Sequence, residues 1–276
     1  MHYSLAASHL VFVYGTLKRG QANHGVLDGA DCLGRVRLHG AALFDQGAFP
    51  MAVLTPGRPD VIHGELYRAD DAGLARLDHL EGYPHLYDRQ RVCLSNGQQA
   101  WVYVGRPEQV AGCRPVHYGD WRATPVFCYG SNLDPDQLSQ RCQDWDGAGL
   151  VVRLDGWTWG INKVADRHDG SGYAGILPSP GSHCLGVVVH LSDRDRAVLD
   201  RREGVAIDHY RHQRLWVNSA EGDRFPALVY VPSPEHIAQG LAADADYARR
   251  ILSGSAHWGL GSEWLQALEQ SLLITA

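Results

Sequence analysis

The chain has 276 residues, a formal net charge of −6, 45% hydrophobic residues and 20% charged residues. This is the composition of an ordinary globular chain, and its length allows one or two domains. The acidic balance, without any block of lysine or arginine, argues against a nucleic-acid partner, because phosphate binding needs a basic surface.

The six cysteines show no Cys-x-x-Cys spacing, and they are too sparse for a disulfide scaffold. No apolar run reaches the length of a membrane span, and residues 10–13 are too short for the hydrophobic part of a signal peptide. We therefore expect a cytoplasmic protein with no membrane partner. The oligomeric state is left open.

The first predicted element is a buried strand over residues 10–13, where apolar residues of strand type run together. Gly15 and Gly20 then allow a turn in which the N–H groups of Gly15, Thr16 and Leu17 converge. Such a concavity binds an anion, typically a carboxylate or a phosphate. The alternative is a plain strand-to-loop turn. A nucleotide P-loop is disfavoured, because the glycines are not followed by Lys-Ser/Thr.

Further strands are expected over residues 33–43, 49–54 and 61–67, followed by a helix that starts at Asp70 or Asp71 and ends before Gly82. The spacing of Leu74, Leu77 and Glu81 places all three on one helix face. Glu81 is then a half-buried carboxylate at the negative end of the helix dipole, and both effects raise its pKa. Such a group suits a general base near neutral pH. A glutamate that simply reaches into solvent is the alternative.

Beyond this helix, two strands around residues 88–92 and 100–104 are joined by a turn at residues 96–97. Tyr87, six residues after Glu81, is a candidate for the same pocket, although a tyrosine packed at a strand start is an equal alternative. The segment 105–125 is rich in proline and glycine, and we expect it to close the first domain and link it to the next.

The pattern then begins again. Residues 126–133 (Val-Phe-Cys-Tyr-Gly-Ser-Asn-Leu) closely match residues 11–17 (Val-Phe-Val-Tyr-Gly-Thr-Leu), and Leu-Asp-x-x-Glu-Gly occurs once in each half. Ser192 caps a second helix that ends at Gly204, with Glu203 on its apolar face and Tyr210 beyond it. Because the two helices share little else, retention of the glutamate favours a function. We therefore predict a tandem repeat.

Strands are expected in the second half over residues 151–163, 170–176, 184–191 and 225–231. Two amphipathic helices, near residues 234–253 and 263–273, should cover this half, and no chemistry is assigned to them. The predicted domains are residues 8–122 and 125–276.

Together, Tyr14-Gly15-Thr16-Leu17 with Glu81 and Tyr129-Gly130-Ser131-Asn132-Leu133 with Glu203 resemble the γ-glutamylcyclotransferase superfamily. The first half is similar to the γ-glutamylamine-type branch, and the second half to the longer branch with C-terminal helices. The resemblance implies an α+β fold of two tandem small mixed β-barrel domains, the second with C-terminal helices.

The resemblance also implies an enzyme, a C–N lyase that was formerly classed as an acyltransferase. Its small-molecule substrate would be a γ-glutamyl amide, and its products would be 5-oxoproline and an amine or amino acid. No cofactor and no metal are implied, because the α-amine of the substrate attacks its own γ-carbonyl.

In this interpretation Glu81 and Glu203 are the catalytic residues, each moving a proton from the α-ammonium to the departing amine. The main-chain N–H groups hold the α-carboxylate or the developing oxyanion. The expected substrate-binding residues are Tyr14, Gly15, Thr16, Leu17 and Tyr87 in the first domain, and Tyr129, Gly130, Ser131, Asn132 and Tyr210 in the second.

Two alternatives remain at this point. In the first, one domain is an active enzyme and the other has lost its activity. In the second, the whole chain is a non-catalytic binding module for γ-glutamyl or amino-acid ligands. The glutamate in both halves argues against decay. The turns also differ in charge, since Lys18 and Arg19 in the first half are replaced by Asp134, Pro135 and Asp136 in the second. The two pockets therefore need not accept the same leaving amine.

Overall fold

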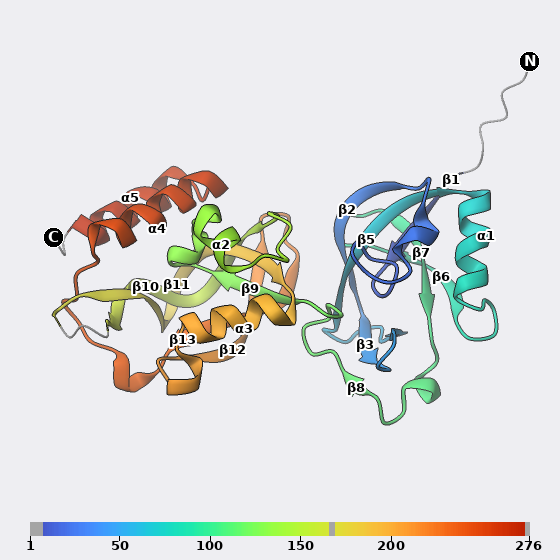
Figure 1. Ribbon diagram of the computed structural model, residues 1–276, viewed down its shortest axis with the longest axis horizontal. Helices are drawn as coiled ribbons and strands as arrows, with labels where there is room; N and C mark the ends of the chain where they lie inside the picture. The colour runs from blue at the N-terminus through green and yellow to red at the C-terminus, as the bar shows by residue number, and fades with distance from the viewer. Residues whose placement is uncertain (1–7, 166–168, 274–276) are drawn as a thin grey trace, which may run out of the picture. The chain divides into compact units, whose positions relative to one another are not determined.

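The computed structural model describes residues 8–165 and 169–273, which fall into two compact units that divide between Trp121 and Arg122 (Figure 1). Both units combine β-sheet with helices, so the α+β class and the tandem arrangement are confirmed. Residues 274–276, at the end of the second predicted domain, lie outside the described part of the chain. Each unit is described by itself.

The first unit is built on a five-stranded sheet in the order β2-β5-β1-β7-β6. Its strands are β1 (Ser8–Val13), β2 (Asp31–His39), β5 (Val61–Asp70), β6 (Asp88–Cys93) and β7 (Gln99–Val104). A three-stranded sheet contains β3 (Ala41–Asp45), β4 (Pro50–Leu54) and β8 (Arg114–Pro115). The helical elements are α1 (Asp71–Leu80), η1 (His24–Leu27) and η2 (Pro107–Val110). Strand β1 lies at the centre, antiparallel to β5 and parallel to β7.

The second unit is a closed barrel in the order β10-β11-β9-β13-β12. Its strands are β9 (Thr124–Cys128), β10 (Leu150–Val164), β11 (Gly172–Leu191), β12 (Tyr210–Ser219) and β13 (Arg224–Pro232). Its helices are α2 (Pro135–Arg141), α3 (Asp193–Arg202), α4 (Ala245–Trp258) and α5 (Ser262–Leu273), with short turns η3 (Ser131–Leu133), η4 (Val205–Ile207) and η5 (Pro234–His236). Strand β9 takes the place of β1, because it pairs parallel with β13 and antiparallel with β11.

The predicted barrel closes in the second unit but not in the first. In the second unit, β10 pairs with β12 through Val152–Ser219 and Arg153–Asn218. In the first unit the corresponding edges, β2 and β6, form no such ladder. They meet where Ser95 N–H donates to the Arg37 carbonyl at 2.9 Å and Arg37 N–H donates to the Ser95 hydroxyl at 3.2 Å. The long strand β10 continues through a bulge at Gly156, whereas the chain breaks at Gly40 into β2 and β3.

The two helices that end at the glutamates of Leu-Asp-x-x-Glu-Gly have the N-terminal caps that their sequences predict. Helix α1 begins after Asp70, whose carboxylate accepts the Gly73 N–H at 2.7 Å, and α3 begins after Ser192, whose hydroxyl accepts the Asp195 N–H at 3.2 Å. Both helices end in a glycine with a left-handed backbone, Gly82 at φ 60° and Gly204 at φ 65°. Each helix therefore stops directly after its glutamate.

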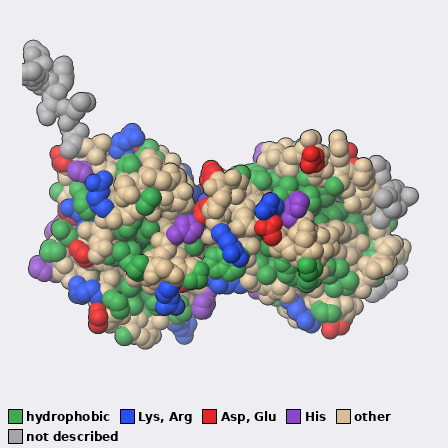
Figure 2. Space-filling model, turned by 180° about the vertical axis from the view of Figure 1, so that it is seen from behind, with side chains coloured by type: hydrophobic (Ala, Val, Ile, Leu, Met, Phe, Trp, Pro, Cys, Tyr) green, Lys and Arg blue, Asp and Glu red, His purple; other side chains and the backbone are tan. Residues whose placement is uncertain are grey.

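The C-terminal helices are present, although the first starts at Ala245 rather than near residue 234, because Asp244 supplies its cap. Within the described ranges, no helix is both long and apolar enough to cross a membrane. On the face shown in Figure 2, basic side chains are interspersed with acidic and apolar ones over both units.

Candidate active site

Strand β1 leads directly into the turn Tyr14–Leu17, and hydrogen bonds from Lys18 and Asn23 stabilise this turn. Lys18 N–H donates to the Gly15 carbonyl at 3.0 Å, while Asn23 donates from its side chain to the Thr16 hydroxyl at 3.0 Å and from its N–H to the Thr16 carbonyl at 2.9 Å. No acceptor among the described residues takes up the N–H groups of Gly15, Thr16 and Leu17. These three groups, called here the first N–H cradle, are free to bind an anion.

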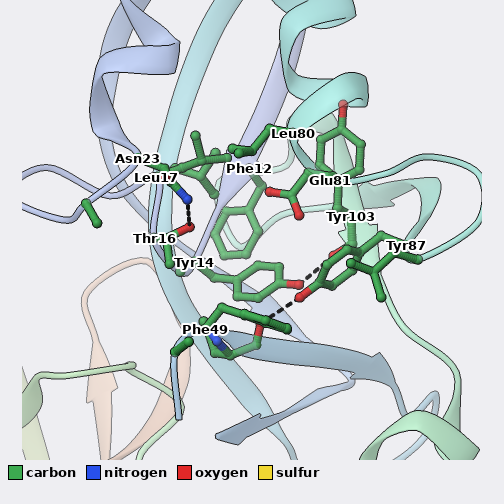
Figure 3. A pocket seen from close by; sticks show the side chains of 16 residues that line it. Phe12, Tyr14, Thr16, Leu17, Asn23, Phe49, Leu80, Glu81, Tyr87 and Tyr103 are labelled. Atoms are coloured by element: carbon green, nitrogen blue, oxygen red, sulfur yellow. Dashed lines mark hydrogen bonds between the residues drawn. The ribbon is translucent and has the colours of Figure 1, made fainter. Parts of the chain in front are cut away.

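Glu81 faces a hollow beside this cradle. Its N–H still donates to the Leu77 carbonyl at 2.9 Å, so it ends α1, and its side chain lies among apolar and aromatic groups (Figure 3). Burial raises the pKa of Glu81 from its ordinary value of 4.5 to about 7. A carboxylate with this pKa can both take up and give up a proton near neutral pH.

This first hollow has a volume of about 280 Å³. Tyr14 donates its hydroxyl to the Tyr103 carbonyl at 2.7 Å, and Tyr87 donates to the Pro50 carbonyl at 3.0 Å. Because these hydroxyls are already engaged, both tyrosines act as walls of the hollow. Phe49, Leu80 and Leu86 also line the hollow, and all three are apolar.

The second hollow, of about 390 Å³, lies in the second unit beside the turn Tyr129–Asn132. Glu203 is held there by Asn132, whose side-chain N–H donates to Glu203 Oε1 at 2.8 Å, and Arg141 donates in turn to Asn132 Oδ1 at 2.6 Å. Burial raises the pKa of Glu203, while the Asn132 hydrogen bond and the positive charges of Arg141 and Lys163 oppose the rise. Glu203 is therefore a desolvated but well-oriented carboxylate.

Helix α4 completes the second hollow, which the sequence did not suggest. The Tyr247 hydroxyl accepts the Ala174 N–H at 3.0 Å and also interacts with the main chain of Ser131. Tyr210 donates to the Ala174 carbonyl at 2.8 Å, as Tyr87 does to Pro50 in the first unit. Helix α4 therefore contributes residues to the site in addition to packing on the second unit.

The same hydrogen-bond network supports the glutamate in both units. Tyr103 donates its hydroxyl to Asp78 at 2.7 Å, three residues before Glu81. Tyr230 donates to Asp200 at 2.6 Å, three residues before Glu203. Each tyrosine lies on the strand parallel to β1 or β9, so this contact ties the end of the helix to the centre of the sheet.

A second partner of the aspartate differs between the units. Arg89 contacts Asp78 at 2.7 and 2.8 Å, whereas His212 contacts Asp200 at 2.7 Å. Both lie opposite the tyrosine in the strand pairing. The aspartate of Leu-Asp-x-x-Glu-Gly is present in both halves of the sequence, and this repetition was the signal that could have revealed its role.

The structure gathers the residues singled out from the sequence into two groups. The first hollow is lined by Tyr14, Gly15, Thr16, Leu17, Glu81 and Tyr87, and the second by Tyr129, Gly130, Ser131, Asn132, Glu203 and Tyr210. Their roles in binding and catalysis stay predictions. In the described ranges, no three His, Cys, Asp or Glu side chains are grouped closely enough to hold a metal ion.

Comparison with known proteins places these sites in a family context. A profile of the family described as "Gamma-glutamyl cyclotransferase, AIG2-like" matches residues 11–123 and again residues 126–255. The chain is similar to "Gamma-glutamylcyclotransferase family protein YtfP" of Escherichia coli K12, with 39% identity over 112 residues that cover 40% of this chain and 94% of the relative.

A second relative, YkqA of Bacillus subtilis, is 29% identical over 219 residues that cover 73% of this chain and 76% of YkqA. Its crystal structure aligns with 97% of this chain and 98% of its own, at 23% identity and a TM-score of 0.47.

Proposed function

The chain belongs to the gamma-glutamyl cyclotransferase, AIG2-like family, and we propose that both of its domains convert a γ-glutamyl amide into 5-oxoproline and a free amine or amino acid. One observation carries the proposal: a desolvated glutamate beside main-chain N–H groups occurs twice, at Glu81 and at Glu203.

The reaction needs no nucleophile from the protein. The α-amine nitrogen of the substrate forms a bond to its own γ-carbonyl carbon, and the amide C–N bond to the leaving group breaks. Glu81 or Glu203 takes one proton from the α-ammonium and returns it to the departing nitrogen. The attacking nitrogen loses a second proton as it becomes the amide nitrogen of 5-oxoproline, and the released amine takes up that proton as its ammonium, so that no net proton is gained or lost. The hollow contributes by folding the substrate so that amine and carbonyl meet, an advantage of up to roughly 7–11 kcal/mol in model systems.

The N–H cradle supplies the electrostatic part of catalysis. In the first domain, the N–H groups of Gly15, Thr16 and Leu17 hold the glutamyl α-carboxylate or the oxyanion that develops at the γ-carbonyl. In the second domain the N–H groups of Gly130 and Asn132 take this role, because the main chain of Ser131 already contacts the Tyr247 hydroxyl. The tyrosine walls Tyr14 and Tyr87, or Tyr129 and Tyr210, confine the folded substrate.

Release of 5-oxoproline from γ-glutamyl amides tests the proposal. The full chain is incubated with γ-glutamylethylamine and with γ-glutamylalanine, and 5-oxoproline and the free amine are measured by chromatography. We expect the two products in equal amounts. The chain would instead be a binding module if calorimetry showed that both compounds bind while neither product forms.

The pH dependence of the first domain follows from Glu81. In a chain that carries Glu203→Gln, kcat/KM for 5-oxoproline release is expected to rise with pH and reach half of its plateau near pH 7, because only the deprotonated carboxylate accepts the proton. A plateau that extends unchanged from pH 5 to pH 8 would contradict this assignment, since a base with an ordinary pKa is already deprotonated there.

A further inference from the structure

The two hollows differ in which charged residues line them. Among the residues that line the first hollow, Glu81 is the only charged one, and its neighbours toward the opening include Leu80 and Leu86. The second hollow is lined by three arginines, one from each of three helical elements. These are Arg141 at the end of α2, Arg202 at the end of α3 and Arg250 in α4.

Arg202 and Arg250 line the same hollow as Arg141, and each lies close enough to Arg141 to repel it. Burial lowers the pKa of Arg141, Arg202 and Arg250 lower it further, and Glu203 and Cys142 oppose these effects. In the described part of the chain, no carboxylate forms an ion pair with any of the three. Clustered cations without paired anions are suited to an anionic ligand.

The acidic residues at this opening have other partners. Asp246 forms an ion pair with Arg249 at 3.2 Å, and the Asp244 carboxylate accepts the Tyr247 N–H at 2.8 Å as the cap of α4. Both carboxylates keep their negative charge, but neither forms an ion pair with Arg141, Arg202 or Arg250. Arg141 is also engaged, since it donates to Asn132 Oδ1 at 2.6 Å. Arg202 and Arg250 are thus the two arginines of the cluster available to a ligand.

The glutamyl part of a substrate does not account for these two arginines, because its α-carboxylate can be held by a main-chain cradle that both domains possess. A feature found only in the second domain is better matched to the part of the substrate that varies, which is the leaving group. We propose that Arg202 and Arg250 form a subsite for a carboxylate of the leaving group, so that the second domain acts on γ-glutamyl amino acids or peptides. The first domain, lined by Phe49, Leu80 and Leu86, then acts on amides of uncharged apolar amines. This inference rests on the proposed function.

A matched pair of compounds tests the division, since γ-glutamylalanine and γ-glutamylethylamine differ only by one carboxylate. The Glu81→Gln chain reports the second domain, and the Glu203→Gln chain reports the first. We expect the second domain to prefer γ-glutamylalanine and the first domain to prefer γ-glutamylethylamine, each measured as a ratio of kcat/KM values. The same preference in both domains would overturn the inference even though turnover supports the proposed function.

Arginine variants locate the subsite. In the Glu81→Gln chain, Arg202→Gln with Arg250→Gln is expected to lower the kcat/KM ratio of γ-glutamylalanine to γ-glutamylethylamine by about 10- to 100-fold, the usual effect of losing charge-assisted hydrogen bonds. Lysine at both positions should restore part of the preference. The matched control is Arg201→Gln, which changes the neighbouring exposed arginine of α3 and should leave the ratio unaltered.

Binding separates this inference from the proposed function. In the chain with Glu81→Gln and Glu203→Gln, calorimetry measures the affinity for γ-glutamylalanine without turnover. Removal of Arg202 and Arg250 should weaken that affinity by about the same 10- to 100-fold. An unchanged affinity would overturn the subsite whether or not the wild-type chain releases 5-oxoproline, whereas a lack of 5-oxoproline from the wild-type chain would contradict only the proposed function.

Discussion

Replacing Glu81 and Glu203 together by glutamine is expected to lower 5-oxoproline release by about 100-fold or more, the usual contribution of a positioned general acid–base group. Glutamine has almost the same shape but cannot accept the proton of the α-ammonium. Each single replacement should abolish only the activity of its own domain. The measurement is the steady-state rate with γ-glutamylethylamine and with γ-glutamylalanine.

The control for this experiment is Glu108→Gln, which changes an exposed glutamate outside the first hollow and should leave the rates unaltered. If both single variants and the double variant keep the wild-type rates, neither glutamate is catalytic. Loss of all activity in one single variant, with the other unaffected, would instead support one working domain beside an inactive one.

Stability provides a second readout of the same replacement. The pKa of Glu81 is raised to about 7 in the folded chain, so the folded state binds this proton more tightly than the unfolded chain does. The free energy of unfolding of the first domain therefore falls as pH rises from about 4.5 toward 7. Since glutamine carries no charge, Glu81→Gln should make the first domain more stable than the wild type at pH 8 and similar to it at pH 4, as measured by urea unfolding.

Gly64→Ala is expected to destabilise the first domain by about 1–3 kcal/mol or more, because a β-carbon has no room there. It would overlap the Val13 carbonyl oxygen and lie 2.6 Å from the ring of Phe12. Both neighbours belong to β1, which leads into the Tyr14–Leu17 turn. The variant should therefore lower the urea concentration at which the first domain unfolds and also reduce the activity of a Glu203→Gln chain.

The second domain offers the matched substitution. A β-carbon at Gly186 would overlap the Cys128 carbonyl oxygen and lie 2.6 Å from the ring of Phe127, so Gly186→Ala should act in the same way on that domain alone. Gly25→Ala is the control, because the space around Gly25 is open. If Gly64→Ala unfolds at the same urea concentration as Gly25→Ala, the glycine is not required for the approach of β1 to β5.

Much of this protein could be predicted from short stretches of sequence. The repeated Tyr-Gly turn, the caps at Asp70 and Ser192 and the glycines that end both helices depend on neighbouring residues, because turns and caps are local hydrogen-bond arrangements. The periodicity of α1 likewise placed Glu81 on a buried face. The sequence by itself therefore determined the tandem arrangement and, for each hollow, the turn residues, the glutamate and two tyrosines of its lining.

Contacts between distant segments could not be predicted in this way. Tyr103 reaches Asp78 because β7 pairs beside β1, and the first sheet stays open because its edge strands meet only at Arg37 and Ser95 within the described residues. Helix α4 brings Tyr247 and Arg250 to the second hollow from far along the chain. Strand pairing and helix docking depend on how complete surfaces fit together, and no local pattern contains that information. Only the tertiary structure therefore decided that Glu81 is the one charged residue in the lining of the first hollow and that three arginines line the second.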